Sequence, residues 1–175
     1  MVGHSRRGKA AVLAGAFDER VALVVPHQAG TGGDALSRGT ITQEPVFLVN
    51  WFYPNWFNDI FASYNFRVHK LPIDQHELVA LAAPRAVMVT ASEGYRWAGF
   101  SSSLRGMRQI DEVYRLFGVD GLVGDGMVMY EEPVVASEVG NLLQYRREDG
   151  HRLDPGYWKV ILDYATVVFG RVDLR

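Results

Sequence analysis

The stretch GHSRRGKAA, residues 3–11, decides the fold class, because it joins a short apolar start to a helix through a tight turn with a serine at the corner. A strand, a sharp turn and a helix with a hydroxyl at the turn is how α/β proteins present a nucleophile. Ser5 is therefore a candidate nucleophile. The spacing departs from the common G-x-S-x-G pattern, because Arg7 precedes the second glycine, Gly8. By itself, a serine ahead of a helix is more commonly an N-cap.

Composition limits the classes of function. The 175 residues can bury the core of about one domain. The net charge of −2 lacks the excess of positive charge that is typical of nucleic-acid-binding proteins. No apolar run reaches the length of a membrane span, so we expect neither nucleic acid nor membrane as a partner. The absence of cysteine excludes disulfides, thiolate metal sites and a cysteine nucleophile. No cluster of histidines and carboxylates stands out in the sequence, so we expect no metal and no cofactor.

Strand patterns alternate with helix patterns, which predicts an α/β layered fold with a parallel sheet. We expect strands at 21–25 and 86–91, a third near 1–3 and a weaker fourth at 127–130 or 142–146. We expect helices at 6–17, 71–85 (beginning near Asp74), 103–117 (ending at Gly118) and 155–169, a glycine-rich loop at 27–40, and irregular structure with one helix at 46–66.

The predicted sheet is small for a doubly wound fold, and Met-Val-Gly at the start resembles the last residues of a strand. We therefore expect residues 1–175 to form a single partial domain, the C-terminal half of a larger one. Such a half sheet would expose an unpaired edge, which makes self-association a possible outcome.

The order of residues along the chain supports a catalytic Ser5. In α/β-hydrolases the triad runs serine, acid, histidine, with the histidine late in the sequence. His151 fits this order, because it lies in the polar loop EDGHRLDPG ahead of the last predicted helix. His27 directly follows a strand, which fits the order less well, and His76 lies in a helical pattern, which is typical of a structural histidine.

Five segments in order resemble the glucuronoyl esterases, carbohydrate esterase family fifteen. They are GHSRRGKAAVLAGAFDERVALVV at the start, GTGG at 30–33, NWFYPNWF at 50–57, LPIDQHELVALAAPR at 71–85 and HRLDPGYW at 151–158. The resemblance covers nearly the whole chain. It implies the C-terminal part of an α/β-hydrolase-like three-layer sandwich, beginning at the nucleophile turn.

The resemblance implies catalytic roles for three residues. Ser5 would be the nucleophile and His151 the base that takes its proton. Arg6 would place its guanidinium at the oxyanion, where a fixed cation stabilises the developing negative charge.

The resemblance also implies three substrate-binding residues. Lys9 and Glu44 would hydrogen-bond the hydroxyls of a uronic acid ring, and Trp97 would line the sugar pocket. The alternatives are a solvated helix face for Lys9 and core packing for Trp97.

The sequence offers two positions for the triad acid. Many family members carry a glutamate where this chain has Gln28, which cannot hold a charge. Other members place the acid after the later strand, where Glu93 is the available carboxylate, and the family's acidic residue after the tryptophan is Gly99 here. We therefore expect Glu93 to be the acid, with a solvent-facing loop residue as the alternative.

The resemblance implies a serine carboxylic-ester hydrolase that cleaves esters of 4-O-methyl-glucuronic acid, with glucuronoxylan or lignin-carbohydrate esters as partners. It also implies a secreted or periplasmic location, although no apolar signal region precedes Ser5. Two alternatives stay open. One is an acetyl or other carbohydrate esterase on the same fold, and the other is an inactive remnant with residual sugar binding.

Overall fold

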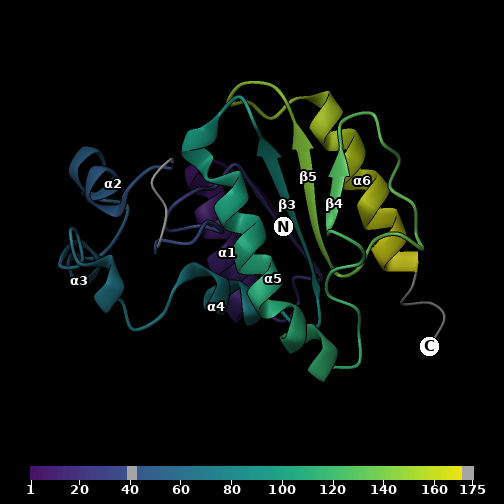
Figure 1. The fold of residues 1–175 in the computed structure, drawn as a ribbon, viewed down its shortest axis with the longest axis horizontal. Coiled ribbons are helices and arrows are strands. Elements are labelled where there is room, and N and C mark those ends of the chain that lie inside the picture. Colours follow the sequence, from purple (N-terminus) through teal and green to yellow (C-terminus); the bar gives the residue numbers. More distant parts are fainter. Residues whose placement is uncertain (39–42, 171–175) are drawn as a thin grey trace.

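A computed structural model describes residues 1–38 and 43–170 of the chain. Its strands form one parallel sheet in the order β1-β2-β3-β5-β4, as Figure 1 shows in part. The strands are β1 (Val2–His4), β2 (Leu23–His27), β3 (Ala86–Ser92), β4 (Met127–Met129) and β5 (Leu142–Arg147). The parallel α/β fold expected from the alternating patterns is confirmed.

Helices cover both faces of this sheet and complete three layers (Figure 1). They are α1 (Arg6–Phe17), α2 (Val46–Phe52), α3 (Asp59–Ala62), α4 (Gln75–Ala80), α5 (Phe100–Leu116) and α6 (Pro155–Gly170), with 3₁₀ turns η1 (Val68–Lys70) and η2 (Arg96–Ala98). Helices α1, α4 and α5 pack on one face and α6 on the other. In the view of Figure 1, α2 and α3 lie to one side, away from β3 and β5.

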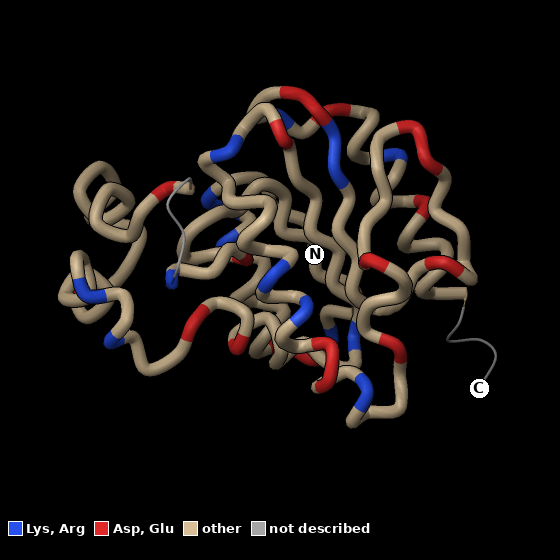
Figure 2. The backbone as a smooth tube through the Cα atoms, in the orientation of Figure 1, with Lys and Arg blue, Asp and Glu red and all other residues tan. Residues whose placement is uncertain are grey.

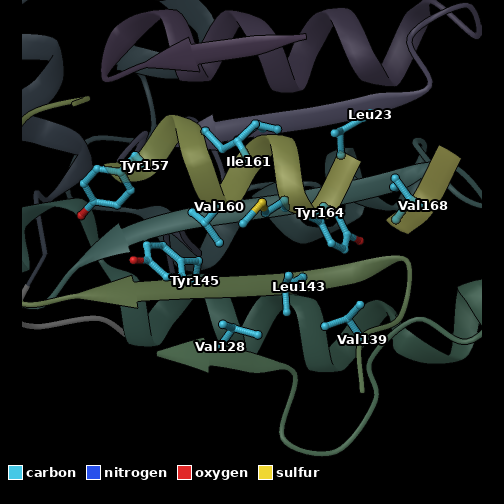
Figure 3. Packing of buried hydrophobic residues seen from close by; sticks show 13 residues of the cluster. Leu23, Val128, Val139, Leu143, Tyr145, Tyr157, Val160, Ile161, Tyr164 and Val168 are labelled. Atoms are coloured by element: carbon cyan, nitrogen blue, oxygen red, sulfur yellow. The ribbon is translucent and has the colours of Figure 1, made fainter. Parts of the chain in front are cut away.

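Alternation of side chains along buried strands builds the two layers of the core. In β3, Ala86 and Met88 belong to the cluster beneath α6, whereas Val87 and Val89 belong to the cluster beneath α1, α4 and α5. This period of two is the geometry of a strand, and a strand buried on both faces is apolar throughout. Figure 3 shows how the α6 side of the core interleaves residues of the sheet with those of the helix.

The carboxyl ends of the parallel strands share one edge of the sheet. The chain leaves β1 at Ser5, β2 at Gln28, β3 at Glu93, β4 at Tyr130 and β5 at Glu148, so five connecting segments start at this edge. In Figure 2 the middle of the sheet is tan, and charged residues gather in the loops and on the helices. Ligands of open α/β sheets bind outside the carboxyl ends of the strands, so this edge is where a site is expected.

Two strand predictions differ from the structure in detail. The strand predicted at 21–25 begins at Leu23 and continues through Pro26 to His27, which keeps its register with Thr90 of β3. A proline removes one donor but keeps an extended φ, so the ladder loses one bond and continues. The weak strand was placed at either 127–130 or 142–146, and both segments form strands, β4 and β5.

Three helix predictions also differ at their limits. The 46–66 segment contains two short helices instead of one, because Asn58 accepts a bond from the Phe61 N–H and starts a second helix. Helix α5 begins earlier than expected, after Gly99 at φ 68°. Asp74 and Glu77 form a capping box that starts α4, as the position of Asp74 predicted, but α4 ends at Ala80, earlier than the predicted limit of 85.

The glycine-rich loop is irregular as expected up to residue 38, and its last two residues lie outside the described range. None of the helices in the described part of the chain is both long and apolar enough to cross a membrane.

Candidate active site

The turn between β1 and α1 holds Ser5 in a strained conformation. Its φ is 56° and its ψ is −125°, a region that non-glycine residues rarely adopt. Such strain costs about 1–3 kcal/mol and is concentrated at functional sites. Ser5 stands at the N-cap position, yet its side chain makes no capping hydrogen bond. The N-cap alternative therefore does not account for the serine.

Glycines on either side make this turn possible. A Cβ on Gly3 would overlap the backbone carbonyl of Arg7, and a Cβ on Gly8 would lie 2.7 Å from the Cβ of Ala29. The first turn of α1 therefore approaches both the strand and the glycine loop more closely than any side chain allows. Gly8, one position later than in the common pattern, meets this requirement.

Ser5 opens into a pocket of about 410 Å³ at the carboxyl edge of the sheet. Six predicted site residues line this pocket, namely Ser5, Arg6, Lys9, Glu44, Trp97 and His151. They come from the start of α1, the segment before α2, the η2 turn and the loop after β5. The structure thus brings together residues that are far apart in the sequence.

His151 makes a hydrogen bond through one ring nitrogen, and two aromatic rings pack against its imidazole. Its Nδ1 lies 2.6 Å from Oε1 of Gln28. Tyr95 stacks on the ring at 4.1 Å between centroids, and the His4 ring lies at 4.5 Å. Burial lowers the pKa of His151 to about 4, and the neighbouring His4 and Lys9 act in the same direction. The imidazole is therefore neutral at ordinary pH, as a general base must be.

Gln28 stands beside Nδ1 of His151, the place at which the acid of a serine triad acts. It is 4% exposed, has a φ of 48°, and its backbone N–H donates to the Thr90 carbonyl. Its Nε2 donates to the Gly150 carbonyl at 3.2 Å and lies 3.4 Å from the Tyr157 hydroxyl. An uncharged amide thus faces His151 from the position where many family members carry a glutamate.

The structure places Glu93, the triad acid expected from the sequence, away from Nδ1 of His151. The Glu93 N–H donates to the Arg147 carbonyl, so the residue continues the pairing of β3 with β5. Its carboxylate pairs with the guanidinium of Arg146 at 3.5 Å and lines a different cavity. The strand pairing directs Glu93 toward its neighbour in the sheet, and Gln28 occupies the place at Nδ1.

Lys9 and Glu44 form a partly buried ion pair in the pocket. The Lys9 Nζ lies 3.5 Å from Glu44 Oε2, and it donates to the carbonyls of Ala29 at 2.6 Å and Thr31 at 2.5 Å. The Lys9 side chain is only 10% exposed, so the alternative of a solvated helix face is wrong. Burial lowers the pKa of Lys9 while Glu44 opposes this shift, and burial raises the pKa of Glu44 while Lys9 opposes it.

Trp97 is 44% exposed and lines the pocket, so core packing does not account for it. Its carbonyl accepts the Glu44 N–H at 3.1 Å, which fixes the acidic residue beside the indole. His27, by contrast, is fully buried, with Nδ1 at 2.7 Å from Thr90 Oγ1 and Nε2 at 2.7 Å from the Arg152 carbonyl. Both ring nitrogens of His27 therefore have partners, and the residue lies within β2 instead of after it.

Sequence reasoning missed three aromatic residues of this pocket. Tyr53, Trp56 and Tyr95 all line it, and Tyr95 stacks on the candidate base. The aromatic cluster at 46–66 and the position of Tyr95 two residues before Trp97 were the available signals. Within residues 1–38 and 43–170, no group of three or more histidine, aspartate or glutamate side chains could hold a metal ion.

Comparisons with known proteins define first the class and then the family. A glucuronoyl esterase from Solibacter usitatus superposes with a TM-score of 0.84 at 33% identity, covering 97% of this chain and 42% of that one. An esterase of carbohydrate esterase family 15 from a marine bacterial metagenome superposes with a TM-score of 0.83 at 37% identity, covering 95% of this chain and 41% of that one. The fold is that of the α/β-hydrolase-like esterases.

The family model for fungal glucuronyl esterases matches residues 1–118, and the chain belongs to the glucuronoyl esterase family. It is 38% identical over 167 residues to the carbohydrate esterase MZ0003 of an unknown prokaryotic organism, covering 94% of this chain and 37% of that protein. It is 39% identical over 127 residues to the 4-O-methyl-glucuronoyl methylesterase of Schizophyllum commune, covering 68% of this chain and 32% of that protein. The chain therefore spans about a third of the length of these relatives.

Proposed function

We propose that this chain carries the catalytic part of a serine carboxylic-ester hydrolase that cleaves esters of 4-O-methyl-glucuronic acid. The observation that carries the proposal is that Ser5, with its strained turn, shares one pocket with His151 and with the Lys9–Glu44 pair. Membership of the glucuronoyl esterase family supports the same substrate class.

The chemistry follows from the residues of the pocket. The Ser5 hydroxyl attacks the uronate carbonyl as His151 takes its proton, and a tetrahedral oxyanion forms. Arg6, at the first position of α1 and in the pocket wall, offers a cation to that oxyanion. Collapse breaks the ester bond, the alcohol leaves with the proton from His151, and an acyl-enzyme remains. Water, activated by the same imidazole, then releases the uronic acid and restores the serine.

The substrate class is proposed from the polar and aromatic groups beside the serine. Lys9 and Glu44 offer a donor and an acceptor for ring hydroxyls, and Trp97 offers a flat apolar wall. The relative from Schizophyllum commune is named as a 4-O-methyl-glucuronoyl methylesterase. By this kinship we propose glucuronoxylan or lignin-carbohydrate esters as the substrate, and a secreted or periplasmic location.

One observation favours the second candidate, a sugar-binding protein without turnover. The amide of Gln28 at His151 Nδ1 cannot supply the negative charge that stabilises an imidazolium. Binding of methyl glucuronate without hydrolysis, unchanged by Ser5→Ala, would support this candidate over the esterase.

We expect substrate preference to depend on the Lys9–Glu44 pair. Lys9→Ala or Glu44→Ala should lower kcat/KM for a methyl glucuronate ester by about 10- to 100-fold, because loss of a hydrogen bond to a charged group costs about 1.5–3 kcal/mol. Hydrolysis of an aryl acetate, which has no ring hydroxyls, should change much less. The measurement is the ratio of the two kcat/KM values for each variant.

A matched control is the exposed pair of Lys159 and Asp163 in α6, whose charged atoms lie 2.7 Å apart. Lys159→Ala removes an ion pair far from the pocket and should leave the ratio at its original value. An unchanged ratio in both pocket variants would contradict the proposed sugar recognition while leaving Ser5 as a possible nucleophile.

The pH dependence of hydrolysis should report the lowered pKa of His151. Only the neutral imidazole accepts the serine proton, so kcat/KM should be level near neutrality and fall to half near pH 4 instead of near the ordinary 6.5. Gln28→Glu would place a carboxylate at Nδ1 and should move this midpoint to higher pH. Because burial also lowers the pKa of His27 to about 4, far-UV circular dichroism must confirm folding at each pH. A midpoint at 6 or above in the unaltered protein would contradict this assignment.

A further inference from the structure

The amide of Gln28 has two chemically different ends, and its surroundings fix which end faces His151. The Gly150 carbonyl, 3.2 Å away, can only accept a hydrogen bond, so the amide nitrogen must point toward it. The amide oxygen then points toward Nδ1 of His151 at 2.6 Å. Since that oxygen can only accept, Nδ1 must carry the proton. The other ring nitrogen, Nε2, is left with a free lone pair.

Tyr157 is the second group that holds the amide nitrogen. Its hydroxyl lies 3.4 Å from Gln28 Nε2, 2.8 Å from Asp149 Oδ1 and 3.2 Å from the Ala91 carbonyl. The hydroxyl has one proton, and both Asp149 and Ala91 can only accept it. A lone pair of the hydroxyl oxygen is therefore left for the N–H of Gln28. Burial raises the pKa of Tyr157, and the bond to Asp149 acts in the same direction, so the hydroxyl remains a donor.

Asp149 lies at the far end of these contacts. Its side chain is 4% exposed, and Oδ2 lies 3.2 Å from Arg147 Nε and 3.6 Å from Arg152 Nε. Both guanidinium groups pair with this carboxylate, and a carboxylate accepts a stronger hydrogen bond than a neutral group does. The hydroxyl of Tyr157 is thereby held with its proton toward Asp149.

We propose that Asp149, Tyr157 and Gln28 form a hydrogen-bond relay that holds His151 in the tautomer with its proton on Nδ1. In a serine triad a carboxylate next to the imidazole selects this tautomer. Here the hydroxyl of Tyr157 and the amide of Gln28 lie between the carboxylate and the imidazole. The amide is neutral, and its orientation determines which ring nitrogen of His151 carries the proton. Asp149 and Tyr157 are positioning residues for the base. The catalytic consequence of the relay rests on the proposed role of His151, whereas the tautomer itself does not.

The first test is Tyr157→Phe, which keeps the ring that packs against His27 and Tyr145 and removes only the hydroxyl. The ¹⁵N chemical shifts of the His151 ring report the tautomer directly. In the unaltered protein we expect a protonated Nδ1 and a bare Nε2, and in Tyr157→Phe we expect the second tautomer to become detectable. Turnover should fall about 3- to 10-fold, as for the loss of one supporting hydrogen bond.

Tyr164→Phe is the matched control, because Tyr164 lies in the same helix, is also fully buried and donates its hydroxyl to the Gly140 carbonyl at 2.8 Å. It removes a comparable hydrogen bond away from the pocket, and it should lower stability without changing the His151 spectrum or turnover. An equal spectrum and equal turnover in the Tyr157 and Tyr164 variants would overturn the relay.

A second pair of variants separates the direction of the hydrogen bond from the charge around it. Asp149→Asn introduces an amide that can donate to Tyr157, whereas Asp154→Asn removes a carboxylate that pairs with the same arginines, Arg147 and Arg152. We expect only Asp149→Asn to make the second tautomer of His151 detectable. Equal spectra for these two variants would mean that charge at the arginines, and not the relay, acts on His151.

The spectra can be recorded in a Ser5→Ala background, so the tautomer is measured without any turnover. A protonated Nε2 in the unaltered protein overturns the relay, even if esters are hydrolysed. A protonated Nδ1 that responds to Tyr157→Phe supports the relay, even if no ester is hydrolysed, and in that case the proposed esterase function alone fails.

Discussion

Ser5→Ala is expected to lower the hydrolysis of a methyl glucuronate ester by about 10⁴-fold or more, because it removes the oxygen proposed to attack the ester during acyl-enzyme formation. His151→Ala should cause a loss of similar size, since the serine hydroxyl is a weak nucleophile without a base. The double variant should be little worse than either single one, because the two residues act as one unit. The measurement is kcat/KM for all three variants at neutral pH.

Two exposed residues provide controls for these losses. Ser101 is an exposed residue of α5, and His69 is an exposed residue of the η1 turn. The control variants are Ser101→Ala and His69→Ala. Both should retain the original kcat/KM. Multiplicative losses in the double variant would show that Ser5 and His151 act in separate steps, and a near-original rate in either single variant would remove it from the mechanism.

The candidate site could be predicted from the sequence, because the order of its segments along the chain reflects the topology of a parallel sheet. The turn at Ser5 and the loop at His151 follow β1 and β5, and all parallel strands end at one edge. Local sequence patterns also predict the longer strands and helices. The apolar run of β3 and the stop at Gly118, with φ 74°, follow from side-chain alternation and from glycine's access to positive φ.

Other features depend on contacts between distant segments, which a sequence pattern does not contain. Glu93 and Gln28 both follow strands at the same edge, and only the pairing of β3 with β5 directs Glu93 toward Arg146. Lys9 looks like a surface residue of α1, and it is buried because the glycine loop folds over it with the carbonyls of Ala29 and Thr31.

The short strands were the other uncertain part of the sequence. β4 covers only Met127–Met129 and takes its stability from pairing with β5 and from packing beneath α6. Three residues are too few for a distinct alternation. Their pairing is decided by tertiary contacts, which explains why the sequence offered 127–130 and 142–146 as alternatives when both are strands.

Gly3→Ala is expected to cause the second-largest loss, although it adds only one methyl group. The new Cβ would overlap the carbonyl oxygen and carbon of Arg7, which are backbone atoms in the first turn of α1 and cannot rotate away. The start of the helix must shift, and Ser5 lies between the two points of conflict. A displacement of about 1 Å at a nucleophile can cost about 100-fold in rate, so we expect kcat to fall by about that factor. Overpacking should also lower the free energy of unfolding by about 1–3 kcal/mol.

Gly170→Ala is the matched control, because it adds the same methyl group at a position far from the turn at Ser5. A Cβ at Gly170, the last residue of α6, meets no atom of residues 1–38 and 43–170 within 4 Å, so this variant should keep both its stability and its kcat. Both variants should be compared at a temperature where circular dichroism shows each to be folded, so that loss of folded protein does not enter kcat. A folded Gly3→Ala protein with the original kcat would show that the exact turn at Ser5 is unnecessary, because the nucleophile would then tolerate a displaced helix. The strain at Ser5 and the close approach at Gly3 have one cause, since a turn this tight requires both a positive φ at the serine and bare backbone at the glycine.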